Sequence, residues 1–280
     1  MRIGCSSTIV DMNQRPPRTV HVEHVMGTVV SLDLRGPGDH RAAIAAAVAW
    51  FHEVDRRFSP FRPDSETCRY GRGELADGDR SPELAEIVAA CEAVAARSGG
   101  AFAARRDGSF DPSAYVKGWS VERAGELLAA HGRHDWSLDA GGDVLTSGEP
   151  GPDRLWRVGV QNPFDRVALA TVLTGRRLAV ATSGTYERGA HIVDARSGGV
   201  PSGVASVTVV GADLGFADAY STAAFALASA GPAWLAGIDG YESYTVFADR
   251  TVVATAGFPL VVHGVPIATV PVRSDLMGAA

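Results

Sequence analysis

Apolar residues recur at helical spacing in several long stretches of this chain. In residues 39–58, Ile44, Val48, Phe51 and Val54 form an apolar stripe, as on a helix with one buried face. Proline near the start and glycine beyond the end of a stretch mark the boundaries of others. The predicted helices are Asp39–Phe58, Pro82–Arg97, Asp111 to about His131, Leu214–Ser229 and Pro232–Ile238.

Alternating and β-branched runs predict strands, most of them in the second half of the chain. Residues 59–73 are expected to be a polar turn region, and the runs between 155 and 181 have the spacing of an antiparallel meander. The expected strands are Val20–Leu34, interrupted at Met26-Gly27-Thr28, His134–Ser147, interrupted at Asp139–Asp143, then Leu155–Val160, Ala168–Leu173, Leu178–Ala181, His191–Asp194, Val204–Val210, Ser243–Ala248, Thr251–Ala256, Leu260–Val262 and Ile267–Val272. Because helices cluster early and strands late, we predict an α+β fold with a mostly antiparallel sheet.

The chain is predicted to form one domain over residues 20–273. Prolines within Arg15–Arg18 block regular structure, so we expect residues 1–19 to be a flexible leader and 274–280 a tail. A length of 280 residues is sufficient for a substantial core in a single domain.

Charge, hydrophobicity and cysteine content argue against several kinds of partner and location. The net charge of −6, without a run of Lys or Arg, argues against a nucleic-acid partner and against an anionic membrane surface. No apolar run reaches the length of a membrane span. The three cysteines form no Cys-x-x-Cys pair, and no apolar segment precedes Cys5 as a signal peptide requires. We therefore expect a cytoplasmic protein.

Three side chains with oxygen atoms interrupt the apolar helix predicted at residues 214–229. Asp218, Ser221 and Thr222 stand at i, i+3 and i+4, which places them on one helix face. A carboxylate and two hydroxyls gathered in this way suit a hard cation such as Mg²⁺. The structural alternative is that Asp218 interacts with the helix dipole while the hydroxyls bond back to carbonyl groups.

Other residues are candidates for binding an anion or moving a proton. Lys117 lies early in its helix, where a cation is mildly unfavourable unless it meets a phosphate; a surface lysine is the alternative. Asp111 is either a helix cap or a ligand contact. Residues 181–186, Ala-Thr-Ser-Gly-Thr-Tyr, are either a hydroxyl-rich binding turn or an ordinary polar turn. His191 is either a proton acceptor or structural. The chain lacks both usual glycine-rich phosphate loops.

These candidates belong to a series of short motifs in a particular order. The series is Met26-Gly27-Thr28, Phe61–Glu66, Asp111–Trp119, Asp139–Asp143, Ala181–Tyr186, His191–Asp194 and Ala217–Thr222. Taken together, the motifs resemble those of the ApbE family, the FAD:protein FMN transferases. The resemblance extends over about residues 22–250. Each motif alone is weak, but their order is specific.

The resemblance implies both a fold and a reaction. The fold would be a single compact T-fold-like domain with packed helices. In the reaction, which depends on Mg²⁺, a Thr or Ser hydroxyl of a target flavoprotein attacks the FAD phosphorus nearer riboflavin, and AMP leaves. The acceptor would carry a motif like Asp-x-x-Ser/Thr-Gly-Ala-Thr.

Site residues follow from the resemblance by position. His191 matches the base that activates the acceptor hydroxyl, and Asp218 could share this role. The implied metal ligands are the carbonyl of Ala114 with Asp218, Ser221 and Thr222. The implied FAD contacts are Met26, Phe61, Ala101, Phe102, Asp111, Lys117, Thr182, Gly184, His191 and Ile192.

The sequence departs from the family pattern in places. Gly-Ala-Phe is usually followed by Asp, whereas this chain has Ala103, and the segment from there to Asp111 is shorter than in many members. The usual Asp-Pro-x-Thr-Gly is replaced by Asp194–Gly198. Two other functions remain open: an FAD pyrophosphatase that releases FMN and AMP, and a flavin-binding protein without turnover. The complete Asp218, Ser221 and Thr222 set argues against the binding protein.

Overall fold

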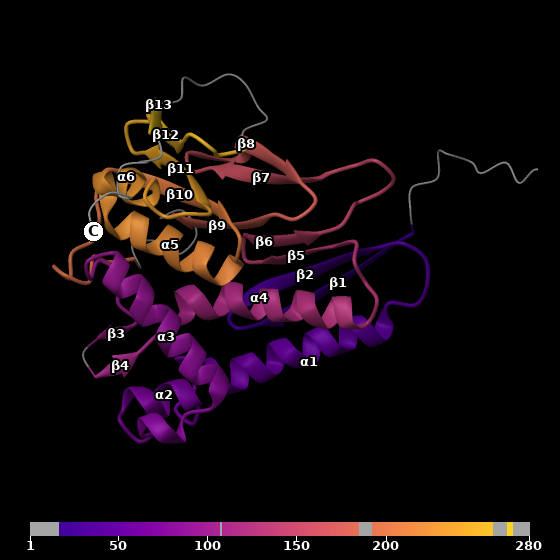
Figure 1. Ribbon diagram of the computed structural model, residues 1–280, viewed down its shortest axis with the longest axis horizontal. Helices are drawn as coiled ribbons and strands as arrows, with labels where there is room; N and C mark the ends of the chain where they lie inside the picture. The colour runs from indigo at the N-terminus through magenta and orange to yellow at the C-terminus, as the bar shows by residue number, and fades with distance from the viewer. Residues whose placement is uncertain (1–16, 107, 185–191, 260–267, 271–280) are drawn as a thin grey trace, which may run out of the picture.

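The centre of the fold is a nine-stranded sheet whose neighbouring strands run antiparallel, apart from the parallel pair at one edge. The computed structural model describes residues 17–106, 108–184 and 192–259, and the backbone of 268–270 (Figure 1). In spatial order the strands are β1 (Arg18–Val25), β2 (Thr28–Arg35), β5 (Trp136–Ala140), β6 (Asp143–Ser147), β9 (Ala179–Gly184), β10 (Val204–Gly211), β11 (Tyr241–Phe247), β12 (Val252–Thr255) and β13 (Ala268–Val270).

Helices cover one face of this sheet (Figure 1). They are α1 (Arg41–Phe58), α2 (Glu66–Gly71), α3 (Pro82–Arg97), α4 (Ser113–Ala130), α5 (Leu214–Ala226) and α6 (Gly231–Leu235), with the short 3₁₀ turns η1 (Asp77–Asp79) and η2 (Ala228–Ala230). Phe51 of α1, Trp119 of α4 and Phe225 of α5 share one apolar core with Leu32 and Leu138 of the sheet. Burial of this layer supplies most of the driving force that places α4 and α5 on the sheet.

The opposite face is covered in part by a separate hairpin of β7 (Trp156–Asn162) and β8 (Asp165–Gly175). Val158 and Leu173 of the hairpin form a second core with Val180, Tyr244 and Val246 of the large sheet. Two short strands, β3 (Arg105–Arg106) and β4 (Ser109–Phe110), form a hairpin that follows α3 and precedes α4 in the sequence. No helix within the described ranges is long and apolar enough to cross a membrane.

The predicted α+β architecture, with a mostly antiparallel sheet, is confirmed. The helix predicted at Pro82–Arg97 is α3 with the same bounds. Ser81 caps it, because its hydroxyl accepts a hydrogen bond from the Leu84 amide at 3.2 Å, and Pro82 has the fixed φ that suits a first helical position. The predicted strand Leu260–Val262 lies outside the described residues.

Met26 and Gly27 are not an irregularity within one strand but the two-residue turn of the β1–β2 hairpin. Val25 pairs with Thr28, and the two residues between them have φ values of 55° and 67°. Turns with positive φ at both central residues match the right-handed twist of the strands that they join. Met26 adopts this conformation without being a glycine, which is uncommon.

The polar turn predicted at residues 59–73 is wrong, because capping and packing form a helix there. Residues 59–73 contain helix α2, whose N-terminal cap is Ser65 and whose Tyr70 packs edge-on against Phe110. The helix predicted from Asp111 to about His131 is α4, Ser113–Ala130, but its N-cap residue is Pro112 and not Asp111.

Two predictions about strands are also corrected. The strand predicted at Leu178–Ala181 is present as β9, but it does not continue a meander from β8; it pairs with β6 and β10 in the large sheet. Residues 192–194 form no strand; the Asp194 carbonyl accepts a hydrogen bond from the Gly198 amide at 2.7 Å, which closes a turn.

Candidate active site

Helices α4 and α5 cross so closely that their backbones touch. A Cβ atom added at Gly118 would lie 2.3 Å from the Leu214 carbonyl oxygen, so only glycine fits this position without displacing a helix. Glu122, one turn further along α4, accepts a hydrogen bond from the Leu214 amide at 2.8 Å. The crossing brings Lys117, the neighbour of Gly118, near Asp218 on α5.

Lys117 lies between two carboxylates. Its Nζ is 2.7 Å from Asp143 Oδ2 and 3.7 Å from Asp218 Oδ2. Asp143 is 1% exposed and Asp218 is 4% exposed, so both charges are largely removed from water. Asp143 Oδ1 also accepts a long hydrogen bond, 3.4 Å, from the Thr182 amide of β9. Lys117 itself is partly exposed, and its ammonium group is a fixed positive charge beside two buried carboxylates.

Three hydroxyls lie next to this cluster. Ser183 Oγ, at the end of β9, is 2.8 Å from Ser221 Oγ and 3.1 Å from Thr222 Oγ1. Ser221 Oγ donates to the Asp218 carbonyl oxygen at 2.9 Å. Ser221 and Thr222 therefore lie on the part of α5 that faces β9, and helical spacing places Asp218 on the same helix face.

The β1–β2 and β5–β6 turns meet at the same end of the sheet. A Cβ at Gly141 would lie 2.4 Å from Thr28 Oγ1, so the two turns are in contact. Met26 is tied to α4, because the Ser120 hydroxyl lies 3.7 Å from its sulfur. A cavity of about 450 Å³ opens at this turn and is lined by residues 24–29 and Asp55.

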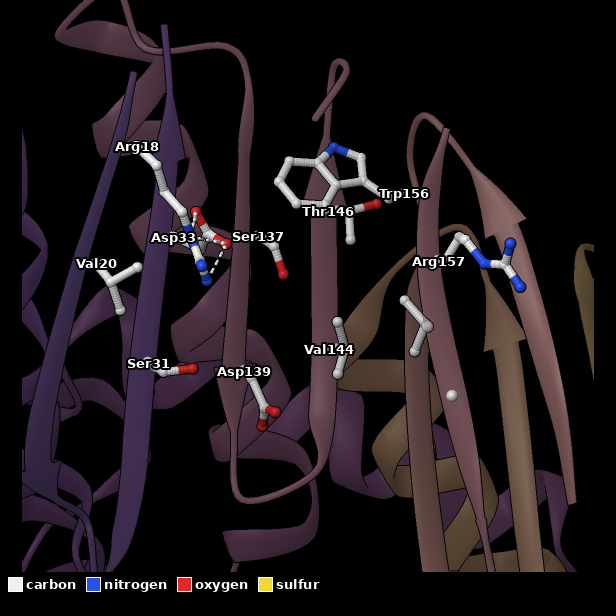
Figure 2. Close-up of a pocket in the computed structure, with 12 residues that line it drawn as sticks. Arg18, Val20, Ser31, Asp33, Ser137, Asp139, Val144, Thr146, Trp156 and Arg157 are labelled. Atoms are coloured by element: carbon white, nitrogen blue, oxygen red, sulfur yellow. Dashed lines mark hydrogen bonds and ion pairs between the residues drawn. The ribbon is translucent and has the colours of Figure 1, made fainter. Parts of the chain in front are cut away.

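A second cavity, of about 280 Å³, lies on the sheet face opposite the helices (Figure 2). Asp139 lies in it near the β5–β6 turn, while the Arg18–Asp33 ion pair lies further along the strands. Burial raises the pKa of the Asp139 carboxyl, and the neighbouring charge of Asp143 raises it further; the hydrogen bond from the Gly142 amide and the charge of Lys117 oppose this. The charges of Lys117 and Asp143 thus act on the pKa of Asp139.

The structure brings some predicted site residues together and leaves others apart. Lys117, Thr182, Asp218, Ser221 and Thr222 gather through contacts with Asp143 and Ser183. Asp143 and Ser183 were not predicted as site residues, although both lie inside the recognised motifs at 139–143 and 181–186. Gly184 follows Ser183 and pairs with Ser206 of β10.

The remaining predicted contacts lie in other surroundings. Phe61 is 88% exposed, whereas Ala101, Phe102 and Ile192 are buried in the core. Asp111 is exposed and its Oδ1 accepts a hydrogen bond from the Ser113 amide at 3.0 Å. Ala114 is partly buried in the first turn of α4. His191 lies outside the described residues.

The donor atoms at the α4–α5 crossing fit a hard cation that the protein ligates only in part. Asp218 and Thr222 offer a carboxylate and a hydroxyl one helical turn apart, which is the oxygen chemistry that Mg²⁺ prefers. Within the described residues, no group of three or more His, Cys, Asp or Glu side chains is arranged to hold a metal ion. Mg²⁺ commonly takes its other ligands from water and substrate phosphates.

Known structures share this fold. The flavin transferase ApbE from Vibrio cholerae superposes with a TM-score of 0.77 at 19% identity, covering 88% of this chain and 100% of that one. The ApbE protein from Thermotoga maritima superposes with a TM-score of 0.73 at 22% identity, covering 84% and 96%. The architecture is therefore that of the solved ApbE structures.

Sequence comparison identifies the family. The ApbE family model matches residues 26–107 and 103–245, so the chain belongs to the ApbE family. The FAD:protein FMN transferase of Rhodobacter capsulatus is 36% identical over 121 residues, which is 40% of this chain and 23% of that protein. That of Treponema pallidum is 31% identical over 166 residues, 52% of this chain and 46% of that protein. The matches thus span less than half the length of these curated relatives.

Proposed function

We propose that the protein is a Mg²⁺-dependent FAD:protein FMN transferase. The observation that carries this proposal is Lys117 held beside Asp218 and Asp143 in an ApbE fold. In the reaction, the oxygen of an acceptor Ser or Thr forms a bond to the phosphorus nearer riboflavin. The bond between that phosphorus and the bridging oxygen breaks, AMP leaves, and the acceptor proton passes to a base.

Lys117 supplies the positive charge that receives the diphosphate of FAD. Its Nζ is already fixed by Asp143, so little reorganisation is needed when an anion arrives. In phosphoryl transfer, positioning and charge neutralisation supply most of the catalysis. A lysine held in place between two elements of the fold is well suited to both tasks.

Asp218 and Thr222, with Ser221 and the carbonyl of Ala114 predicted beside them, would hold the cation. Mg²⁺ bound there would neutralise charge on the diphosphate. The Asp218 carboxylate is the residue on which this depends most, because the hydroxyl and carbonyl donors are uncharged. Lys117, at 3.7 Å from Asp218, balances that carboxylate when no cation is bound.

The flavin and acceptor contacts complete the proposal. Met26 borders the cavity at the β1–β2 turn, and the exposed ring of Phe61 is available to a ligand. Thr182 and Gly184 lie at the end of β9, and the Thr182 amide contacts Asp143, the partner of Lys117. We assign the remaining FAD contacts to Ala101, Phe102, Asp111, His191 and Ile192. His191, aided by Asp218, would accept the proton of the acceptor hydroxyl.

The acceptor that we propose is a flavoprotein bearing a motif like Asp-x-x-Ser/Thr-Gly-Ala-Thr, encountered in the cytoplasm. The test is incubation with FAD, with and without Mg²⁺, and with a peptide of this motif. A matched peptide with Ala in place of the acceptor Ser or Thr is the control. We expect Mg²⁺-dependent AMP release with flavin bound to the first peptide only.

Other outcomes would replace the proposal. Release of both AMP and free FMN regardless of peptide would identify an FAD pyrophosphatase. Bound FAD that is never cleaved, at any Mg²⁺ concentration, would identify a flavin-binding protein without turnover.

A further inference from the structure

The hydroxyls of Ser183, Ser221 and Thr222 form a chain of hydrogen bonds that begins on a backbone carbonyl. Ser221 Oγ is 2.9 Å from the Asp218 carbonyl oxygen, Ser183 Oγ is 2.8 Å from Ser221 Oγ, and Thr222 Oγ1 is 3.1 Å from Ser183 Oγ. Ser221 is 0% exposed and Ser183 is 7% exposed, while Thr222 is less deeply buried. Water therefore has little access to the first two hydroxyls.

The Asp218 carbonyl oxygen fixes the direction of each hydroxyl proton in this row of hydrogen bonds. A carbonyl oxygen only accepts, so Ser221 must use its single hydroxyl proton on Asp218. Ser221 then accepts from Ser183, which consumes the Ser183 proton. The bond between Ser183 and Thr222 consequently requires Thr222 to donate. The Thr222 proton is thus turned toward β9.

We propose, on the basis of the cation site in the proposed function, that Ser183 is a positioning residue that orients the Thr222 hydroxyl for a cation. A neutral hydroxyl binds a cation through an oxygen lone pair, and a proton directed at the cation would oppose binding. With its proton held by Ser183, Thr222 presents its two oxygen lone pairs away from β9. This refines the proposed ligand set: Ser221, buried and committed to the Asp218 carbonyl, is the fixed start of the row of hydroxyls, and Asp218 and Thr222 are the side-chain ligands.

The first test measures cation affinity without turnover. Mn²⁺ replaces Mg²⁺, free Mn²⁺ is followed by electron paramagnetic resonance, and ADP supplies a diphosphate without a flavin; binding by ADP alone is subtracted. We expect Ser183→Ala to weaken Mn²⁺ binding by about 10–100-fold, the usual effect of losing a group that orients a ligand. Ser183→Thr, which keeps the hydroxyl, should bind much more tightly than Ser183→Ala.

Ser206→Ala is the matched control. Ser206 is a buried serine on the neighbouring strand β10, 1% exposed, and its hydroxyl has no hydrogen-bond partner within the described part of the chain. Its removal should leave Mn²⁺ affinity unchanged. Wild-type affinity in Ser183→Ala, an equal loss in Ser206→Ala, or no rescue by Ser183→Thr would each refute the positioning role. Melting temperatures without metal separate a loss of folding from a loss of orientation.

A second test separates ligand from positioning residue on α5. Thiolates favour soft cations, so a cysteine at a ligand position should shift preference from Mn²⁺ toward Cd²⁺. We expect this shift in Thr222→Cys and not in Ser221→Cys, relative to wild type, which carries the native cysteines. An equal shift in both variants would show that Ser221 is itself a ligand.

The outcomes distinguish this inference from the proposed function. If Asp218→Ala also binds Mn²⁺ as wild type does, the cation site is elsewhere and both proposals lose their basis. If Asp218→Ala loses binding while Ser183→Ala keeps it, only the positioning role of Ser183 fails. Wild-type protein that binds no Mn²⁺ in the presence of ADP would overturn the cation site.

Discussion

Replacement of Gly118 by alanine should damage both the stability and the catalytic function of the protein. The new Cβ would lie 2.3 Å from the Leu214 carbonyl oxygen and 2.8 Å from the Gly215 amide nitrogen. These are backbone atoms, which cannot rotate aside as a side chain can, so α4 and α5 must move apart. Because Lys117 and Asp218 lie on these two helices, their 3.7 Å separation would change with the movement.

The expected loss of stability follows from two opposing effects. Overpacking a close contact costs about 1–3 kcal/mol, and a clash with backbone belongs at the upper end. Alanine in place of glycine inside a helix returns about 1 kcal/mol. The net loss is about 2 kcal/mol of unfolding free energy, which for a domain of this size lowers the melting temperature by about 4–8 °C.

Thermal unfolding and AMP release from FAD measure the two effects. We expect the rate of AMP release by Gly118→Ala to fall further than the unfolded fraction explains, well below the melting transition. Gly78→Ala is the control, because a Cβ at Gly78 meets nothing within 4 Å and its φ is not positive; its stability should change by less than about 0.5 kcal/mol. If Gly118→Ala melts with the wild type and keeps its activity, the close crossing is not what holds the site.

Three further substitutions test individual residues. Asp218→Ala should abolish Mg²⁺-dependent AMP release while leaving the circular dichroism spectrum intact, and full activity in this variant would place the cation elsewhere. His191→Ala should slow transfer to an acceptor peptide by about 10²–10⁴-fold with FAD still bound, as for a lost general base; an unchanged rate would give His191 a structural role. Burial raises the pKa of Asp139 in the folded protein, so its ionisation costs stability as pH rises from about 4, the usual carboxyl value, through the raised pKa. Asp139→Asn removes this cost, so the variant should become increasingly more stable than wild type as pH rises to neutral, as measured by urea unfolding. A stability difference that does not change with pH would contradict the raised pKa of Asp139.

Local signals predicted the elements that have strong ends and a clear period. α3 begins at a serine cap followed by proline and ends before two glycines, so its bounds could be read directly. The same approach failed for α2, a six-residue helix whose stability comes from burial of Thr67 and Tyr70 and not from an apolar period. It also failed for the Met26-Gly27 turn, because one alternating run continues through both strands of the hairpin.

The residue types at the site were predicted better than the contacts between them. The i, i+3, i+4 spacing of Asp218, Ser221 and Thr222 placed three oxygens on one helix face, because helical periodicity is a local property. Lys117 was recognised as a cation suited to an anion, but its ion pair with Asp143 was not, since the two residues come from separate elements. Asp143 and Ser183 lay within recognised motifs without a role until the fold supplied their partners.

The sequence by itself determined the helices with strong caps, the α+β class and the residue types that carry the chemistry, because propensity, periodicity and capping act over a few residues. Only the tertiary structure decided that Gly118 meets Leu214 and that Ser183 bonds to Thr222, 39 positions away. Such contacts depend on which face each element buries and how strands are ordered in the sheet. Burial of the shared core then fixes these distances, and no local pattern encodes them.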